Sequence, residues 1–236
     1  MRRLIILTGG ALIALIVFLI LLNGFYLRLN RPVVKSVTIP EGLSNREITA
    51  LLVESDILID EELPEELEGY LFPDTYEFFV PSSLDFVVDK MSRRFNEKIL
   101  SIIPEDKDVR EIIIAASLIE EEVSSPEDRM IVSDIIWKRI KRGMFLEIDA
   151  SICYIKPAPC HPIFKEDFKI DSKYNTYLYK GLPPGPITNP GLGSVEAAIN
   201  PKQSPYWFYL SSSEGGETIF ASYLDEHRAN IVKYLK

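Results

Sequence analysis

The chain has 236 residues and carries 26 basic and 35 acidic side chains, which gives a net charge of −9 at pH 7. This excess of negative charge disfavours nucleic acid and anionic membrane surfaces as ligands. The length suffices for one membrane segment together with a soluble part that has a hydrophobic core and a small appended module.

An uncharged, largely apolar stretch runs from Leu4 to Leu27. A helix rises about 1.5 Å per residue, so this stretch exceeds the roughly 30 Å hydrocarbon core of a bilayer, and we expect a transmembrane helix over residues 1–27. The alternative is a cleaved signal peptide, with a shorter apolar region of about 7–15 residues and a small-x-small cleavage site. Residues 23–26, Asn-Gly-Phe-Tyr, offer no such site, which favours an uncleaved anchor.

A small module is expected over residues 28–62. Its sequence predicts a short strand over 33–40. Ser44 and Glu47 then form a capping-box pattern, which opens a helix that ends near residue 55.

The main domain is expected over residues 63–236. Residues 70–80 are rich in aromatic and β-branched side chains, which predicts a strand with a turn at Pro73 and Asp74. Further helices are predicted over 82–100, 108–123, 125–142, 194–200 and from 223 onward, with strands over 205–211 and 218–221 around a turn at 214–217. The expected N-caps are Ser82, Asp108, Ser125 and Ser194, and the expected C-cap is Gly143. The predicted fold class is α+β, mostly helical with short strands.

The segment 174–191 contains four prolines and three glycines, which exclude a helix or a central strand there. It also carries three tyrosines and hydrogen-bonding side chains. Such a loop can be rigid and can line a carbohydrate groove with aromatic and amide groups. The alternative is a well-packed structural loop.

Several motifs resemble, in the same order, those of the endolytic murein transglycosylase family (MltG, YceG-like). They are Glu-Gly-Tyr-Leu-Phe-Pro-Asp-Thr-Tyr at 68–76, Ala-Ser-Leu-Ile-Glu-Glu-Glu at 116–122, Tyr-Asn-Thr-Tyr at 174–177, Gly-Leu-Pro-Pro-Gly-Pro-Ile at 181–187 and Asn-Pro-Gly at 189–191. The resemblance covers roughly residues 33–236. It implies that residues 28–62 are a shortened LysM-like module and that residues 63–236 are a YceG-like catalytic domain.

The resemblance also implies a function. Members of this family are lytic transglycosylases that cut the β-1,4 bond between MurNAc and GlcNAc in nascent peptidoglycan, leave 1,6-anhydro-MurNAc ends and so terminate strand elongation. The expected location is the bacterial inner membrane, with a single-pass anchor and the catalytic domain on the periplasmic, extracytoplasmic side. Peptidoglycan synthases are possible partners, and no cofactor is expected. The alternatives are a muramidase-type hydrolase and an inactive peptidoglycan-binding scaffold.

The resemblance assigns the catalytic acid to Glu120. This residue follows a run of apolar side chains over 112–119, and partial desolvation favours the uncharged carboxyl that a general acid needs. The small residues 116–117, one turn earlier, are expected to leave room for a substrate. The alternative is a solvated helix end. We expect Glu122 to support the fold or site and Glu121 to face water.

Five residues are the candidates for binding the glycan: Asp149, Tyr174, Asn175, Thr176 and Tyr177. Tyrosine rings pack on sugar faces, and an amide reads hydroxyl or acetamide groups. The Asp149 carboxylate is expected either to stabilise positive charge in the transition state or to cap the next turn. The alternative for each tyrosine is a buried aromatic cluster.

The two cysteines, Cys153 and Cys160, allow a disulfide in an oxidising compartment, a pair of unpaired thiols, or a zinc site with His161 that lacks a fourth ligand. No metal site is therefore predicted. His227, Trp137 and Trp207 are expected to have structural roles.

Overall fold

The structure, a computed structural model, describes residues 15–23, 25, 32–157, 160–212 and 216–235. The expected membrane anchor lies largely outside these ranges, and its residues 15–23 and 25 are helical. Across the described ranges, no helix combines the length and the apolar character that crossing a membrane requires. The anchor over residues 1–27 stays a prediction.

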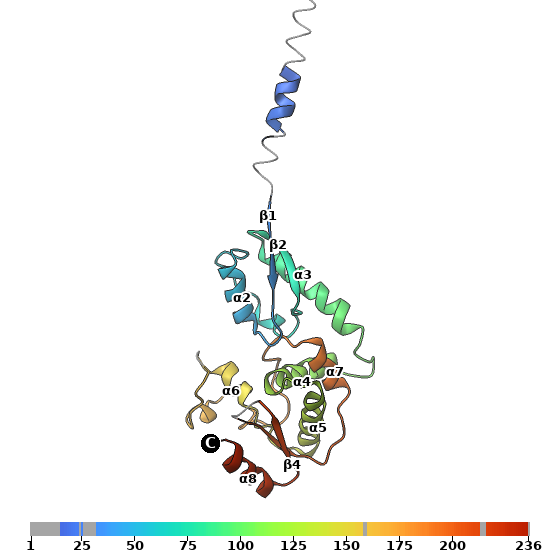
Figure 1. The fold of residues 1–236 in the computed structure, drawn as a ribbon, viewed down its shortest axis with the longest axis vertical. Coiled ribbons are helices and arrows are strands. Elements are labelled where there is room, and N and C mark those ends of the chain that lie inside the picture. The colour runs from blue at the N-terminus through green and yellow to red at the C-terminus, as the bar shows by residue number, and fades with distance from the viewer. Residues whose placement is uncertain (1–14, 24, 26–31, 158–159, 213–215, 236) are drawn as a thin grey trace, which may run out of the picture.

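A first packed unit is built on two antiparallel strands, β1 (Val33–Thr38) and β2 (Thr75–Val80). Figure 1 shows α2 (Asn45–Glu54) and α3 (Leu84–Phe95) on either side of this ribbon. Apolar side chains from all four elements form one buried cluster, which includes Ile39, Ile48, Leu52, Leu71, Phe78, Val87 and Met91. The cluster therefore continues past residue 62, where we expected the small module to end.

The capping box of α2 is confirmed, because Ser44 and Glu47 exchange hydrogen bonds with each other's backbone. Two other predictions in this unit are wrong in detail. The N-cap of α3 is Ser83, since the Ser82 hydroxyl instead donates to the carbonyl of Phe79 at 2.7 Å. The strand β2 begins only at Thr75, after the turn that was expected inside it.

A second packed unit consists mainly of helices: α4 (Val109–Glu122), α5 (Pro126–Arg142), α6 (Asp149–Ile155) and α7 (Leu192–Ile199). Every residue of α4 from Ile112 to Ile119 is buried, so α4 is the predicted core helix. Helices α5 and α7 pack against it and against each other. The predicted caps Asp108, Ser125 and Gly143 are confirmed, the last with φ of 63°. Ser194 is not a cap, because α7 already begins after Gly191.

The C-terminal part adds a second antiparallel pair, β3 (Phe208–Ser211) with β4 (Thr218–Ala221), and α8 (Leu224–Tyr234) packs beside it (Figure 1). Residues 214 and 215 of the turn expected over 214–217 lie outside the described residues. The short helical turns η1 (Glu65–Leu67), η2 (Asn96–Leu100) and η3 (Asp167–Lys169) complete the assignment. The mixture of helices and small antiparallel sheets confirms the α+β class.

Candidate active site

Glu120 lies near the C-terminal end of α4, and its carboxylate is held inside the protein. One oxygen accepts a hydrogen bond from Nη2 of Arg129 at 2.7 Å, and the other accepts from the backbone N–H of Gly191 at 2.9 Å. The Glu120 side chain is 6% exposed and the Arg129 side chain 13%. The carboxyl is therefore not part of a solvated helix end, and it touches the last glycine of the proline-rich segment.

Arg129 connects the two helices that form the site. It lies in the first turn of α5, and its Nε also donates to the carbonyl of Val123, just past the end of α4. A cation at this place is favourable because the C-terminal end of a helix carries partial negative charge. Arg129 was not predicted from the sequence, although its position in the first turn of the helix that follows the Glu120 motif was a usable signal.

A second carboxylate reaches the same place from the first packed unit. A Cβ atom placed on Gly191 would lie 1.9 Å from Cδ of Glu41, so the Glu41 carboxylate rests directly against this glycine. Glu41 follows β1. Partial burial and the charge of Glu120 raise the pKa of Glu41, while Arg129 acts in the opposite direction. The sequence analysis did not identify this residue either.

The end of the proline-rich loop covers α4. The N–H of Ile187 donates to Oγ of Ser117 at 3.1 Å, and the hydroxyl of Thr188 donates to the Ser117 carbonyl at 3.4 Å. Ala116 and Ser117 are both fully buried. The expectation that these small residues leave room for a substrate is therefore wrong, because the loop fills the space.

Asn189 joins this loop to the first packed unit. It is fully buried, and its amide donates to the Leu43 carbonyl, to Oδ1 of Asn45 and to Oε1 of Glu68. Its Oδ1 accepts from the N–H of Leu71. Burial raises the pKa of Glu68 to about 8, even though the backbone N–H of Asn45 also donates to its carboxyl.

Asp149 and Tyr177 lie together, although they are far apart in the sequence. The Tyr177 hydroxyl donates to Oδ1 of Asp149 at 2.5 Å. Asp149 is exposed in the first turn of α6, and the N-cap of this helix is Ile148 with no side-chain bond, so Asp149 is not an N-cap. Within the described residues, no hydrogen bond or ion pair connects Glu120 to this pair.

Glu122 instead lies on the side of Asp149 and Tyr177. It hydrogen-bonds the hydroxyl of the half-buried Tyr209. Burial, with the charges of Asp149 and Glu121, raises the pKa of Glu122 to about 7, although Tyr209 and Arg139 lower it. Glu120 and Glu122 thus face different surroundings. Glu121 is exposed as a residue, as predicted, but one oxygen of its carboxyl lies beside Gly42, and burial is the largest cause that raises its pKa to about 7.

The remaining predicted contacts hold the loop together. The Asn175 amide is fully buried and donates to the carbonyls of Phe168 and Ile170. The Thr176 hydroxyl is buried against Ser151. The Tyr174 ring is half-buried, 4.9 Å from the ring of Tyr154. These three side chains therefore shape the segment around Asp149 and Tyr177.

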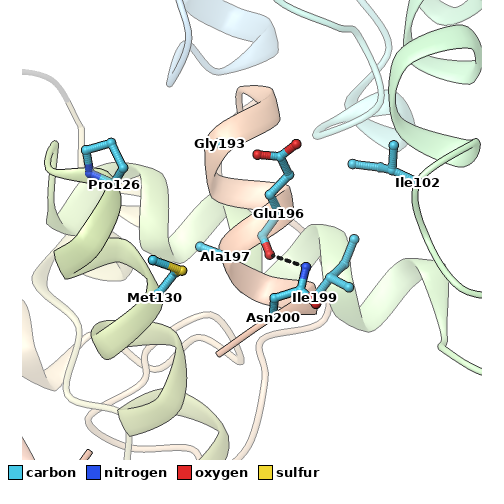
Figure 2. Close-up of a pocket in the computed structure, with 8 residues that line it drawn as sticks. All are labelled: Ile102, Pro126, Met130, Gly193, Glu196, Ala197, Ile199 and Asn200. Atoms are coloured by element: carbon cyan, nitrogen blue, oxygen red, sulfur yellow. Dashed lines mark hydrogen bonds between the residues drawn. The ribbon is translucent and has the colours of Figure 1, made fainter. Parts of the chain in front are cut away.

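A hollow of about 390 Å³ lies around α7. Figure 2 shows Pro126 and Met130 on one side of this helix and Ile102 on the other. Gly193 also lines the hollow, and a Cβ there would lie 2.8 Å from Nη1 of Arg129. The hollow therefore adjoins the partner of Glu120.

Cys153 and Cys160 form a disulfide with a Cα–Cα distance of 4.8 Å, so the alternative of unpaired thiols is wrong. Their sulfurs lie near His161, but in the disulfide neither is a thiolate that could bind zinc. His227 stacks on Phe208, and burial lowers its pKa. The indole N–H of Trp137 donates to the carbonyl of Ala198, which fits a structural role.

Two curated proteins of the same name are similar to this chain. The chain is 36% identical over 183 residues to a Bacillus subtilis protein named endolytic murein transglycosylase. The aligned region covers 75% of this chain and 51% of that protein. A Streptococcus pneumoniae protein of the same name is 28% identical over 78% of this chain and 35% of its own length. The chain thus spans about half the length, or less, of these curated relatives.

A solved structure also matches. The crystal structure of a putative YceG-like protein from Listeria monocytogenes superposes with a TM-score of 0.71 at 26% identity, over 82% of this chain and 75% of that one. The sequence pattern of the YceG-like family matches residues 20–233, nearly the whole chain. The chain therefore belongs to the YceG-like family.

Proposed function

We propose that this chain is an endolytic lytic transglycosylase that cuts the MurNAc–GlcNAc β-1,4 bond of nascent glycan strands, leaves 1,6-anhydro-MurNAc ends and so terminates strand elongation. The names of its relatives support this reading. One observation carries it: the Glu120 carboxyl is enclosed between Arg129 and the N–H of Gly191, at the end of the proline-rich loop.

Glu120 is the proposed general acid and base. It gives its proton to the glycosidic oxygen as the bond from that oxygen to C1 breaks. The oxygen of the C6 hydroxyl of the same MurNAc then bonds to C1, and Glu120 takes up the proton released from that hydroxyl. One proton leaves and one returns, and no water is consumed. Arg129 and Gly191 would hold the carboxylate between the two steps through charge-assisted hydrogen bonds.

The glycan contacts are proposed to come from Asp149, from Tyr177 and from the half-buried ring of Tyr174. Asp149 is exposed and Tyr177 fixes its direction, which suits contact with a sugar or with positive charge that develops on it. Asn175 and Thr176 would act indirectly, by holding the loop in shape.

The proposed setting is the bacterial inner membrane. Residues 1–27 would anchor the chain, and the catalytic part would face the periplasmic, extracytoplasmic side, where peptidoglycan and its synthases are found. Strands β1 and β2 enclose helix α2 in sequence, which supports a LysM-like module in this part of the chain.

The test is product analysis by mass spectrometry after incubating the purified full-length chain with glycan strands. We expect 1,6-anhydro ends from the unchanged chain and at least a thousandfold less product from Glu120→Gln, with the fold retained in circular dichroism. The matched control is Glu111→Gln, since Glu111 is exposed at the other end of α4. Reducing ends would indicate a hydrolase, and binding without any change in strand length would indicate an inactive scaffold.

A further inference from the structure

The surroundings of Glu120 pose a specific problem for a general acid. Both Arg129 and the Gly191 N–H donate hydrogen bonds to its carboxyl, and such donors favour the ionised form of a carboxylic acid. A general acid must bring a proton to the reaction. The site therefore needs a feature that opposes these two donors, and the nearby charges show one.

The candidate is the Glu41 carboxylate, which shares Gly191 with Glu120. The N–H of Gly191 donates to Glu120, and the Cα of Gly191 faces Glu41. A Cβ atom on Gly191 would lie only 1.9–2.4 Å from the three carboxylate atoms of Glu41. The two carboxyl groups interact electrostatically in the folded chain. Like charges at close range favour protonation of one of the two groups.

The backbone holds Glu41 in this place. The N–H of Gly42 donates to the carbonyl of Asn189 at 3.0 Å, and the N–H of Asn189 donates to the carbonyl of Leu43 at 3.0 Å. The Asn189 amide adds a second bond to the same Leu43 carbonyl. Residues next to Glu41 are thus hydrogen-bonded to a residue next to Gly191, so the backbone of the fold maintains the contact between Glu41 and Gly191.

We propose that Glu41 is a positioning residue of the active site, which acts through Glu120: its carboxylate, held against Gly191, places beside Glu120 a negative charge that opposes the charge of Arg129. The inference rests on the proposed function, because it assigns a role in the same reaction. It also means that the first packed unit supplies part of the active site, so the catalytic unit is incomplete without it.

The charges around Glu41 support an electrostatic interaction between Glu41 and Glu120. Glu120 on α4 raises its pKa and Arg129 on α5 lowers it, with burial as the largest cause of the net rise. Glu121 on α4 lies beside Gly42, and the charges of Glu47 and Glu120 add to burial in raising its pKa to about 7, so a further acidic group lies next to Glu120. Within the described part of the chain, Arg129 is the cation whose charge acts on Glu41.

The first experiment is the pH profile of kcat/KM for release of 1,6-anhydro ends by the full-length chain. In Glu41→Gln the alkaline limb should move down by about half a pH unit or more, since the charge that opposes ionisation of Glu120 is gone. The rate should fall about three- to tenfold above pH 7 and stay near the original value at low pH. Glu41→Asp, which keeps the charge, should restore most of the limb.

Two further variants separate this effect from a structural one. Gly191→Ala keeps the N–H that binds Glu120 but displaces Glu41, so it should shift the alkaline limb in the same direction. Glu54→Gln removes the same charge from an exposed position on α2 and should leave the profile unchanged. An unmoved alkaline limb in Glu41→Gln, or an equal loss of rate at every pH, would overturn the proposal.

A second readout does not depend on activity. In the full-length chain with ¹³C-labelled glutamate, the NMR titration midpoint of Glu41 should fall in Glu120→Gln and rise in Arg129→Gln. A chain that shows these shifts but makes no anhydro product refutes the proposed function and leaves the carboxyl pair established. A chain that makes the product while the Glu41 midpoint ignores both substitutions refutes the role of Glu41 alone.

Discussion

Asn189 connects parts of the chain that lie far apart in sequence. Its amide nitrogen donates to three acceptors, on Leu43, Asn45 and Glu68, and its oxygen accepts from the Leu71 N–H. An asparagine is needed here, because its two amide atoms have opposite hydrogen-bonding roles. The same contacts keep Gly191, and with it the carboxyl of Glu120, in place.

We expect Asn189→Asp to destabilise the fold by about 2–4 kcal/mol, because it replaces the buried amide donor with a carboxylate oxygen that faces three oxygen acceptors. The measurement is the urea midpoint of the purified chain. The control is Asn200→Asp, since Asn200 is exposed at the end of α7. Equal midpoints for the two variants would contradict the role of Asn189.

At the level of residues, the sequence identified Glu120 through its motif and through the apolar run before it. It did not identify Glu41, because nothing local marks a glutamate that follows a strand as part of a distant site. Only the fold brings this residue to Gly191. Asn175 was recognised as important, but the sequence could not tell that the carbonyls of its own loop would occupy its amide.

At the level of elements, the site depends on how the proline-rich loop packs on α4. Ser117 mediates this contact: its hydroxyl donates to the Ile114 carbonyl at 2.8 Å and accepts from the N–H of Ile187 at 3.1 Å. A side chain of this size lets the loop approach α4 closely and still satisfies the buried N–H. Ser117, about one helical turn before Glu120, therefore holds the proline-rich loop against α4.

Ser117→Ala should destabilise the chain by about 1–2 kcal/mol, because it leaves the buried N–H of Ile187 without an acceptor. Ser133→Ala on α5 is a matched control, since Ser133 is equally buried but its hydroxyl has no hydrogen-bond partner among the described residues. That substitution should be neutral or slightly stabilising. Thermal unfolding of both variants measures the difference, and a control that loses as much stability would contradict the explanation.

The helices were predictable where a side chain marks the end. Ser125 directly precedes Pro126, which favours the first position of a helix, and Asp108 directly precedes the helical sequence; both are confirmed as N-caps. The predictions failed at Ser82 and Ser194, where a neighbouring serine or glycine can start the helix equally well. Which one does so depends on tertiary packing, and the local sequence does not contain that information.

At the level of the whole molecule, several carboxyl groups are held where ionisation is unfavourable. Burial raises the pKa of Glu68 to about 8 and that of Glu122 to about 7, and it raises the pKa of Glu41 as well. These groups connect the loop, the first packed unit and the end of α4. Holding these carboxyl groups in buried positions therefore lowers the stability of the fold at neutral pH.

This arrangement predicts how stability depends on pH. An ordinary glutamate ionises near pH 4.5, so above that pH the folded chain keeps protons that the unfolded chain has lost. The stability from Glu68 is fully present below about pH 4.5 and is lost as pH rises through about 8. His227 works in the opposite direction near pH 6.5, because burial lowers its pKa.

The urea midpoint should therefore fall between pH 5 and pH 8.5, and Glu68→Gln should flatten that fall. At pH 5 both chains should have similar stability, because the protonated acid and the amide are both uncharged. At pH 8.5 the variant should be more stable by about 2–4 kcal/mol, since no charge has to be buried. Glu77→Gln, at an exposed position on β2, should retain the slope of the unchanged chain. A variant at position 68 that loses stability with pH as steeply as the unchanged chain would show that another group causes the dependence.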